Sequence, residues 1–118
     1  MLKMNLEYES GVLFVRMNGT LNKRFTRKIN YYLIPLIKKH KIKNVILNLN
    51  ELYGIDESGI NAIINMKSIM KCIKGKLYLL NSDNYLIKML KGLNIKLLSS
   101  EKDIIVEKKV WERWTMRR

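Results

Sequence analysis

Residues 44–64, NVILNLNELYGIDESGINAII, pass from an apolar strand through a short polar turn into an amphipathic helix. The first half is an almost continuous apolar run, which is typical of a central strand covered on both faces. After the turn, apolar residues recur at helical spacing, and polar residues fill most of the remaining surface. The stretch therefore predicts a buried strand over Asn44–Asn50 and a helix over Glu57–Ile73.

The turn consists of Asp56, Glu57, Ser58 and Gly59. Two acidic residues at a helix start interact favourably with the helix dipole, and Asp56 is suited to accept free backbone N–H groups as the N-cap. Gly59 is expected to leave the neighbouring hydroxyl uncovered. We therefore expect Ser58 to lie exposed where the strand ends and the helix begins.

This turn resembles that of the STAS domain of the anti-sigma factor antagonists, which typically reads D-S-S-G at this position. Three further segments resemble family landmarks. Residues 19–21 (GTL) are similar to the G-x-L after the second strand, residues 75–80 (GKLYLL) to the fourth strand, and residues 90–95 (LKGLNI) to the helix end before the fifth strand. The resemblance covers most of the chain and implies an α/β fold.

The rest of the chain also alternates between strand and helix patterns, after an initial hairpin around the Ser10-Gly11 turn. The expected elements are strands over Asn5–Glu9, Val12–Met17, Lys76–Leu80 and Ile95–Leu98, and helices over about Lys23–Lys39, about 81–91 and after Ser100. Together they predict one α/β domain over residues 1–118, with a STAS-type mixed, mainly parallel sheet of about five strands and about four helices.

Three residues define local expectations for the helices. Pro35 lies inside the first expected helix, where it removes a hydrogen bond and costs about 3 kcal/mol, so we expect a kink or break near Leu33. Tyr32 is expected on the packing side of this helix with the other apolar residues. Gly75 is expected to end the central helix, and Cys72 to be a small buried apolar residue.

The composition favours a folded protein, with 47% hydrophobic and 28% charged residues. No apolar run is long enough for a membrane helix, and the N-terminus lacks the apolar core of a signal peptide, so a cytoplasmic location is expected. Cys72 is the only cysteine, so no internal disulfide or cysteine-based metal site is expected, and no cofactor motif is present. Ser58 has neither a G-x-S-x-G elbow nor a nearby base, which argues against an enzyme.

The formal net charge of +13 is the least ordinary feature of the composition. Such a surface attracts polyanions, acidic proteins or anionic lipids through a salt-sensitive force. The densest cluster is Lys38–Lys43, which includes His40, the only histidine, read as a surface residue. Because no aromatic-and-basic stacking motif accompanies the charge, a solvated lysine-rich surface is favoured over nucleic-acid binding.

In the family that this chain resembles, the serine at the position of Ser58 is phosphorylated by a partner kinase that is itself an anti-sigma factor. The resemblance implies that unphosphorylated Ser58 lies in the surface that docks on the anti-sigma factor and displaces sigma. Phosphorylation would release the partner, because it adds about −1.5 to −2 charge beside two carboxylates. Asp56 is hypothesised to orient or polarise the Ser58 hydroxyl, while the kinase supplies ATP and metal. The expected partner-binding residues are Asp56, Glu57, Ser58, Gly59, Asn61, Thr20, Asn22 and Lys23.

Two alternatives to this phosphorylation-switched antagonist stay open. The first is a constitutive STAS interaction module, either a scaffold or a transporter-associated subunit, that is never phosphorylated. It is favoured by three departures from the family pattern, at Asn22, Asn48 and Glu57, where the family usually has acids or a serine. The second is a basic binder of nucleic acid or of an anionic membrane surface, using Lys38–Lys43 and the C-terminal arginines. None of the three requires a small-molecule substrate.

Overall fold

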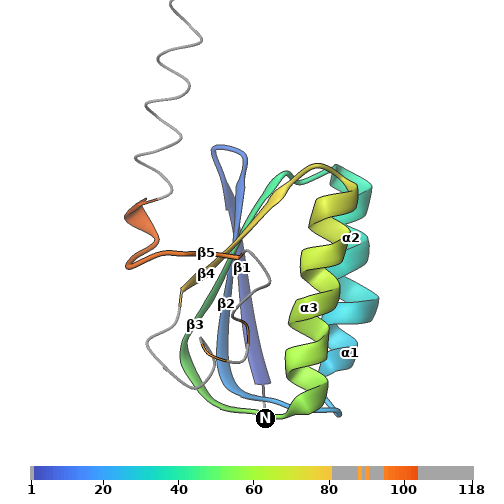
Figure 1. The fold of residues 1–118 in the computed structure, drawn as a ribbon, viewed down its shortest axis with the longest axis vertical. Coiled ribbons are helices and arrows are strands. Elements are labelled where there is room, and N and C mark those ends of the chain that lie inside the picture. The colour runs from blue at the N-terminus through green and yellow to red at the C-terminus, as the bar shows by residue number, and fades with distance from the viewer. Residues whose placement is uncertain (1, 81–87, 89, 91–94, 104–118) are drawn as a thin grey trace, which may run out of the picture.

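The computed structural model describes residues 2–80, 88, 90 and 95–103 (Figure 1). The described residues form a five-stranded sheet in the order β1-β2-β3-β4-β5. The elements are β1 (Leu2–Glu9), β2 (Val12–Leu21), α1 (Thr26–Lys28), η1 (Ile29–Leu33), α2 (Ile34–His40), β3 (Asn44–Ile55), α3 (Glu57–Cys72), β4 (Lys76–Leu80) and β5 (Lys96–Leu97). The two further helices expected from the sequence fall largely on residues 81–94 and 104–118, most of which lie outside the described residues.

The sheet is mixed and mainly parallel, as the sequence predicted. β1 and β2 are antiparallel, whereas β2, β3, β4 and β5 pair in parallel. The hairpin turn explains the first pairing, because Ser10 and Gly11 both have positive φ, 53° and 80°. That combination is typical of the two-residue turn whose twist matches the flanking strands.

The helices cover one face of the sheet, and the main core lies between the two layers (Figure 1). Alternate residues of β1, β2, β3 and β4 point into this core. Side chains from the helices complete it. The largest fully buried members of the main core are Leu2, Met17, Leu21, Ile29, Leu33, Ile37, Leu47, Leu49, Ile63 and Met66.

A π-helical turn, η1, joins α1 to α2 at the place where Pro35 was expected to disturb the helix. The N–H of Ile34 donates to the carbonyl of Ile29, five residues earlier, instead of four. A wider turn here accommodates a proline that has no N–H to donate and whose ring crowds the preceding turn. The expected irregularity is therefore a π turn and not a break. It also changes the helical register, so that Tyr32 is 59% exposed and the prediction that it packs inward is wrong.

A smaller apolar cluster covers the opposite face of the sheet. Its buried members come from the three central strands, and Leu98 packs against them from the chain beyond β5. This cluster explains why Phe14 and Ile46 are buried even though they point away from the helices. The buried members are Val12, Phe14, Ile46, Tyr78 and Leu80.

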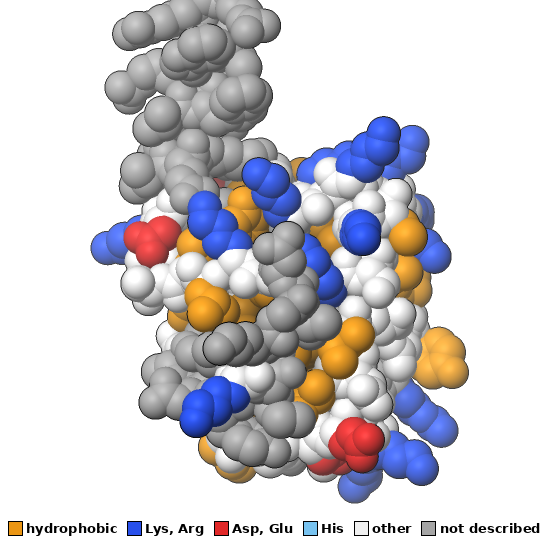
Figure 2. Space-filling view, in the orientation of Figure 1, with side chains coloured by type: hydrophobic (Ala, Val, Ile, Leu, Met, Phe, Trp, Pro, Cys, Tyr) orange, Lys and Arg blue, Asp and Glu red, His pale blue; other side chains and the backbone are white. Residues whose placement is uncertain are grey.

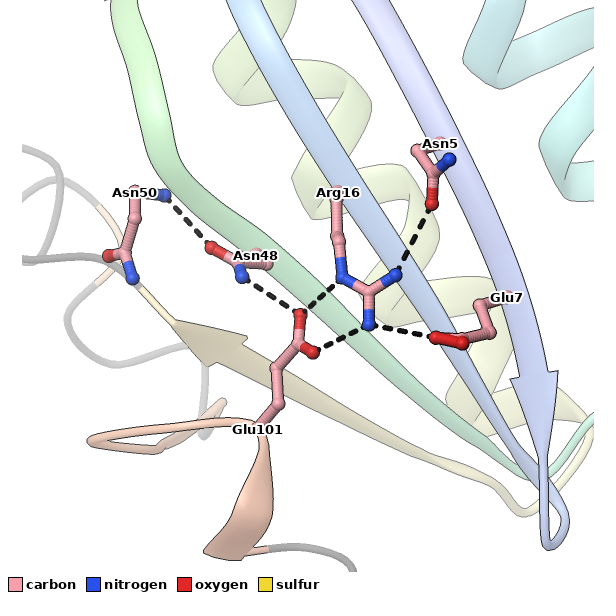
Figure 3. A network of polar contacts seen from close by, with 6 residues as sticks. All are labelled: Asn5, Glu7, Arg16, Asn48, Asn50 and Glu101. Carbon is pink, nitrogen blue, oxygen red and sulfur yellow. Dashed lines mark hydrogen bonds and ion pairs between the residues drawn. The ribbon is translucent and has the colours of Figure 1, made fainter.

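Arg16 continues this face with a network of polar contacts (Figure 3). Its Nε and Nη2 donate to the two carboxylate oxygens of Glu101, at 2.9 and 2.7 Å. Nη2 also donates to Glu7 at 3.0 Å and Nη1 to Asn5 at 3.2 Å. Asn48 donates to Glu101 at 2.8 Å. A two-pronged arginine–carboxylate contact of this kind is strong and directional, so it fixes the segment around Glu101 over β1, β2 and β3.

The Arg16 guanidinium, together with the Asn48 amide, holds the pKa of the Glu101 carboxyl below its ordinary value of 4.5. The same carboxylates of Glu101 and Glu7 raise the pKa of Arg16 further, so that it stays charged at any relevant pH. Because the folded-state pKa of Glu101 is lowered, its contribution to stability is present above the unfolded pKa and is lost as the pH falls through the folded value.

Glu101→Gln is therefore expected to lower the free energy of unfolding by about 1 kcal/mol at pH 7, the value for a partly exposed charge pair. The difference from wild type should shrink as the pH falls from 4.5 through the lower folded-state pKa of Glu101, because wild-type Glu101 becomes neutral over that range. Urea unfolding at pH 7 and at pH 3 measures both values. Glu51→Gln, which removes an exposed carboxylate of β3, is the control and should change stability little. An equal loss for Glu101→Gln at both pH values would contradict the ion-pair account.

The end of α3 differs from the prediction that Gly75 terminates it. Lys74 adopts the left-handed conformation, with φ of 59°, and Gly75 follows it. The N–H of Gly75 donates to the carbonyl of Met70 at 2.7 Å, and that of Lys74 to the carbonyl of Lys71 at 3.1 Å. This is a Schellman ending in which lysine occupies the position that usually carries glycine. Cys72, in the last turn of α3, is exposed, so the prediction that it is buried is also wrong.

Lys74→Gly should raise the free energy of unfolding by about 0.5–1 kcal/mol, because glycine adopts the left-handed conformation without the steric cost that a Cβ imposes. Lys71→Gly, one turn earlier in α3, should instead lower it by about 1 kcal/mol, the usual cost of glycine inside a helix. Thermal unfolding of the two variants beside wild type tests this opposite response. Destabilisation by Lys74→Gly would show that the left-handed residue carries no strain.

Candidate partner-binding surface

The second and third strands run further than the sequence predicted and end together. β2 continues through the expected connection to Leu21, and β3 continues beyond Asn50 to Ile55. Two register shifts, between Arg16 and Asn18 and between Gly19 and Thr20, mark irregularities in the pairing. Leu21 lies opposite Ile55, so the chain leaves both strands at the same edge of the sheet. The structure thus places Thr20, Asn22 and Lys23 beside the Asp56–Gly59 turn.

Asp56 joins the two chain segments at this edge. Its Oδ1 accepts a hydrogen bond from the N–H of Gly59 at 2.9 Å, which makes it the N-cap of α3. Its Oδ2 accepts from the N–H of Lys23 at 3.2 Å, and its own N–H donates to the carbonyl of Leu21 at 3.2 Å. One residue therefore caps the central helix and fixes the connection from β2 to α1.

Gly59 has a different structural role from the one expected. It is buried, and a Cβ at this position would lie 2.5 Å from the carbonyl oxygen of Leu21 and 2.8 Å from Cγ1 of Ile55. Both distances are too short for real contacts. Gly59 therefore allows α3 to begin directly against the ends of β2 and β3, and the missing side chain matters for backbone packing.

Gly59→Ala should lower the free energy of unfolding by about 1–3 kcal/mol, because the added methyl group forces the helix start away from the Leu21 carbonyl. Asn61→Ala, at an exposed position two residues later in α3, is the matched control and should change stability by less than about 0.5 kcal/mol. Urea unfolding of both variants provides the comparison. A Gly59→Ala protein as stable as wild type would refute the close-approach explanation.

Ser58 is the second residue of α3 and is half-buried, which is less exposed than expected. Glu57 and Asn61 are exposed around it. Ala62, one helical turn after Ser58 and on the same side of α3, is buried. Backbone N–H groups and the positive end of the helix dipole favour a negative group at this position. The serine thus lies at the rim of the helix layer, in a field that suits an anion.

Asn22 forms the turn that leads into α1. Its side-chain Oδ1 accepts from the N–H of Arg24 at 3.1 Å, and its carbonyl accepts from the N–H groups of Phe25 and Thr26, both at 3.0 Å. An asparagine performs this local bonding as well as the aspartate that the family usually has. The departure at Asn22 therefore removes a charge from the surface while the turn keeps its hydrogen bonds.

The structure also brings three basic side chains to this edge. Lys23, Arg24 and Arg27 line an open pocket of about 560 Å³. The Arg24 guanidinium lies over the Phe25 ring, 5.6 Å from its centroid. Lys23 was predicted to bind the partner, but Arg24 and Arg27 were not among the residues predicted to do so. Their spacing of three residues, directly after the G-x-L landmark, was the signal that could have identified them.

Tyr53 is a further residue that the sequence did not single out. It lies near the end of β3, three residues before Asp56, and is 78% exposed. Exposed tyrosines are frequent among the residues that dominate binding energy in interfaces.

Among the described residues, no group of three or more His, Cys, Asp or Glu side chains could hold a metal ion. None of the helices in the described ranges is long and apolar enough to cross a membrane.

Comparison with known proteins identifies the family. The family model of the STAS domain matches residues 3–102, so the chain belongs to the STAS domain family. A curated relative, the anti-sigma F factor antagonist of Paenibacillus polymyxa, is 27% identical over 63 residues. That alignment covers 53% of this chain and 54% of the relative, so the chain spans about half the length of the curated protein it matches.

Solved structures share the fold at low sequence identity. The anti-sigma factor antagonist SpoIIAA in its unphosphorylated form has a TM-score of 0.77 at 17% identity, over 90% of this chain and 96% of that one. The phosphorylated form of SpoIIAA from Bacillus also gives 0.77, at 20% identity, over 89% and 98% of the two chains. An anti-sigma factor antagonist from Mycobacterium paratuberculosis gives 0.73 at 13% identity, over 92% and 95%. The predicted STAS-type fold is confirmed.

Proposed function

We propose that this STAS domain is an anti-sigma factor antagonist that docks through the edge around Ser58 and is switched off by phosphorylation at that serine. The observation that carries the proposal is the position of Ser58 in the first turn of α3, beside the Asp56 cap and the connection from β2 to α1. The partner is an anti-sigma factor that is also a serine kinase. The domain itself binds and is modified, and we infer no catalytic activity for it and a cytoplasmic location.

The proposed surface gathers the residues expected from the sequence with those that the structure adds. Asp56, Glu57 and Asn61 come from the turn and from α3, and Thr20, Asn22 and Lys23 come from the opposite segment. Arg24, Arg27 and Tyr53 extend this surface at its margins, and arginine and tyrosine are residue types that concentrate binding energy. Gly59 supports it from below as a buried residue.

Phosphorylation transfers the γ-phosphoryl group of ATP to Ser58. The bond between Ser58 Oγ and phosphorus forms, the bond to the β-phosphate oxygen of the departing ADP breaks, and the hydroxyl proton is released to a base of the kinase or to water. The phosphate brings about −1.5 to −2 charge to a surface that carries the carboxylates of Asp56 and Glu57. A partner surface that fits the unmodified serine does not accommodate that charge and volume, so the complex dissociates.

Asp56 contributes to this switch through geometry in our proposal. Both of its carboxylate oxygens accept backbone N–H groups, from Gly59 and from Lys23. These bonds support the orienting role hypothesised for Asp56, in which it holds the turn that presents Ser58.

A second candidate is the constitutive STAS interaction module. It is favoured by Asn22 and Glu57, which stand where the family usually carries an aspartate and a serine. In that case the same edge binds a scaffold or transporter partner, and Ser58 is an ordinary helix-start serine. The basic binder of nucleic acid or anionic membrane is a third outcome, which the same experiment separates.

The test is quantitative capture of proteins from the native lysate with three baits: wild type, Ser58→Asp and Ser68→Asp. Ser68 is exposed further along α3, so its variant adds the same charge to the same helix away from the proposed surface. We expect wild type and Ser68→Asp to retain a protein with an ATPase-type kinase domain, and Ser58→Asp to retain at least about tenfold less, which corresponds to about 1.4 kcal/mol. Mass spectrometry quantifies each retained protein.

Two other results would overturn the proposal. Equal capture of one partner by all three baits means that the charge at position 58 is irrelevant, and this identifies a constitutive module. If all three baits instead retain mainly nucleic acid or anionic lipid, assayed in the same eluates, and lose it steeply with added salt, the protein is the basic binder.

A further inference from the structure

The pocket lined by Lys23, Arg24 and Arg27 is an unusual concentration of positive charge. Within the described ranges, the ion pairs join Arg16 to Glu7 and to Glu101, and none involves these three side chains. Like charges that converge on one site repel each other, and a bound anion relieves that repulsion. The arrangement therefore has the character of an anion site.

The pocket lies next to the Ser58 turn. The backbone N–H of Lys23 donates to the carboxylate of Asp56, two residues before Ser58. α1, which carries Arg27, contacts α3, and both helices begin at the same end of the helix layer (Figure 1). Figure 2 shows basic side chains beside acidic ones at that end of the molecule. The long, flexible side chains of lysine and arginine can swing towards a charge that appears on this neighbouring turn.

We propose that this pocket receives the phosphate group of phosphorylated Ser58, so that Lys23, Arg24 and Arg27 act as an intramolecular clamp for the modified serine. The inference rests on the proposed phosphorylation of Ser58 and adds how the modified state is held. It assigns Arg24 and Arg27 a specific role, in place of a general contribution to the net charge.

The chemistry of the pocket matches a phosphate. Arginine guanidinium groups bind phosphate oxygens through two parallel hydrogen bonds, and lysine adds a mobile point charge. Three cations against the carboxylates of Asp56 and Glu57 leave a local charge of about +1 before modification, so a phosphate dianion brings it to about −1, instead of about −4 beside the two carboxylates alone. The Arg24 guanidinium is already held over the Phe25 ring, which reduces the side-chain freedom lost on binding.

The clamp has a consequence for the switch. The phosphate would draw the three cations onto itself and remove them from the surface that is offered to a partner. Phosphorylation then changes the docking surface twice, because it adds negative charge at Ser58 and withdraws positive charge from the neighbouring connection. A surface rebuilt in this way discriminates more strongly between the two states than one that gains a charge alone.

The experiment uses the full chain with phosphoserine incorporated at position 58 during synthesis, so that no kinase is required. A ³¹P NMR titration measures the second pKa of this phosphate, which is ordinarily about 6. We expect a value below 6 in the otherwise wild-type chain. In the triple variant Lys23→Gln/Arg24→Gln/Arg27→Gln we expect it to rise by about one unit or more, since nearby opposite charges shift a pKa by about 1–3 units.

The matched control is Lys38→Gln/Lys39→Gln/Lys71→Gln, which removes the same charge from exposed positions at the far ends of α2 and α3. It should leave the phosphate pKa within about 0.3 units of the parent at 0.15 M salt, where charges beyond about 8 Å are largely screened. Equal shifts in the two triple variants, or no shift in either, would refute the clamp. This result is independent of partner capture. A lowered phosphate pKa, together with equal capture by wild type and Ser58→Asp, supports the clamp and refutes the switch. An unshifted phosphate pKa, together with reduced capture by Ser58→Asp, supports the switch and refutes the clamp.

Discussion

The hydrogen bonds of Asp56 are the constraint on which the rest of this edge depends. A single carboxylate caps α3 and holds the connection that follows β2, so two segments separated by more than thirty residues keep one geometry. The cap works only because Gly59 lets the helix begin against the carbonyl of Leu21. The position of Ser58 is thus determined by backbone contacts beneath it. The exposed residues around it can vary in charge without changing where the serine lies.

The sequence predicted those parts of the fold that follow from local pattern. The apolar run of β3, the capped start of α3 and the Ser10-Gly11 turn each carry their own signal, and the structure contains all three. The extension of β3 to Ile55 was missed because Asn50, Glu51 and Gly54 interrupt the apolar run, and this part of β3 pairs with β2 and not with β4. Tyr32 was misplaced because a π turn shifts the helical register, which a fixed period of 3.6 residues does not describe.

Some residues of the candidate site could likewise be predicted from local sequence pattern, and others could not. The turn at Asp56 and its neighbour at Lys23 could be placed from strand order, because both follow strands that end at one edge of a parallel sheet. The basic pocket could not, since lysine and arginine are so frequent in this chain that only their convergence distinguishes Arg24 and Arg27. The role of Arg16 could not be predicted either, because its partner Glu101 lies 85 positions away in the chain. Long-range pairing of side chains leaves no local pattern in a sequence.

The strand order of the sheet has a consequence for how the chain assembles. Since the order in space equals the order in sequence, each strand can add to an edge that the previous strand has just provided. A chain emerging from a ribosome could build this sheet in one direction, without leaving a gap for a later strand to fill. The contact between Arg16 and Glu101 is the exception, because its two ends belong to the first hairpin and to the chain beyond β5. This ion pair can form only after all five strands have been synthesised, so it is the last of these contacts to stabilise the sheet.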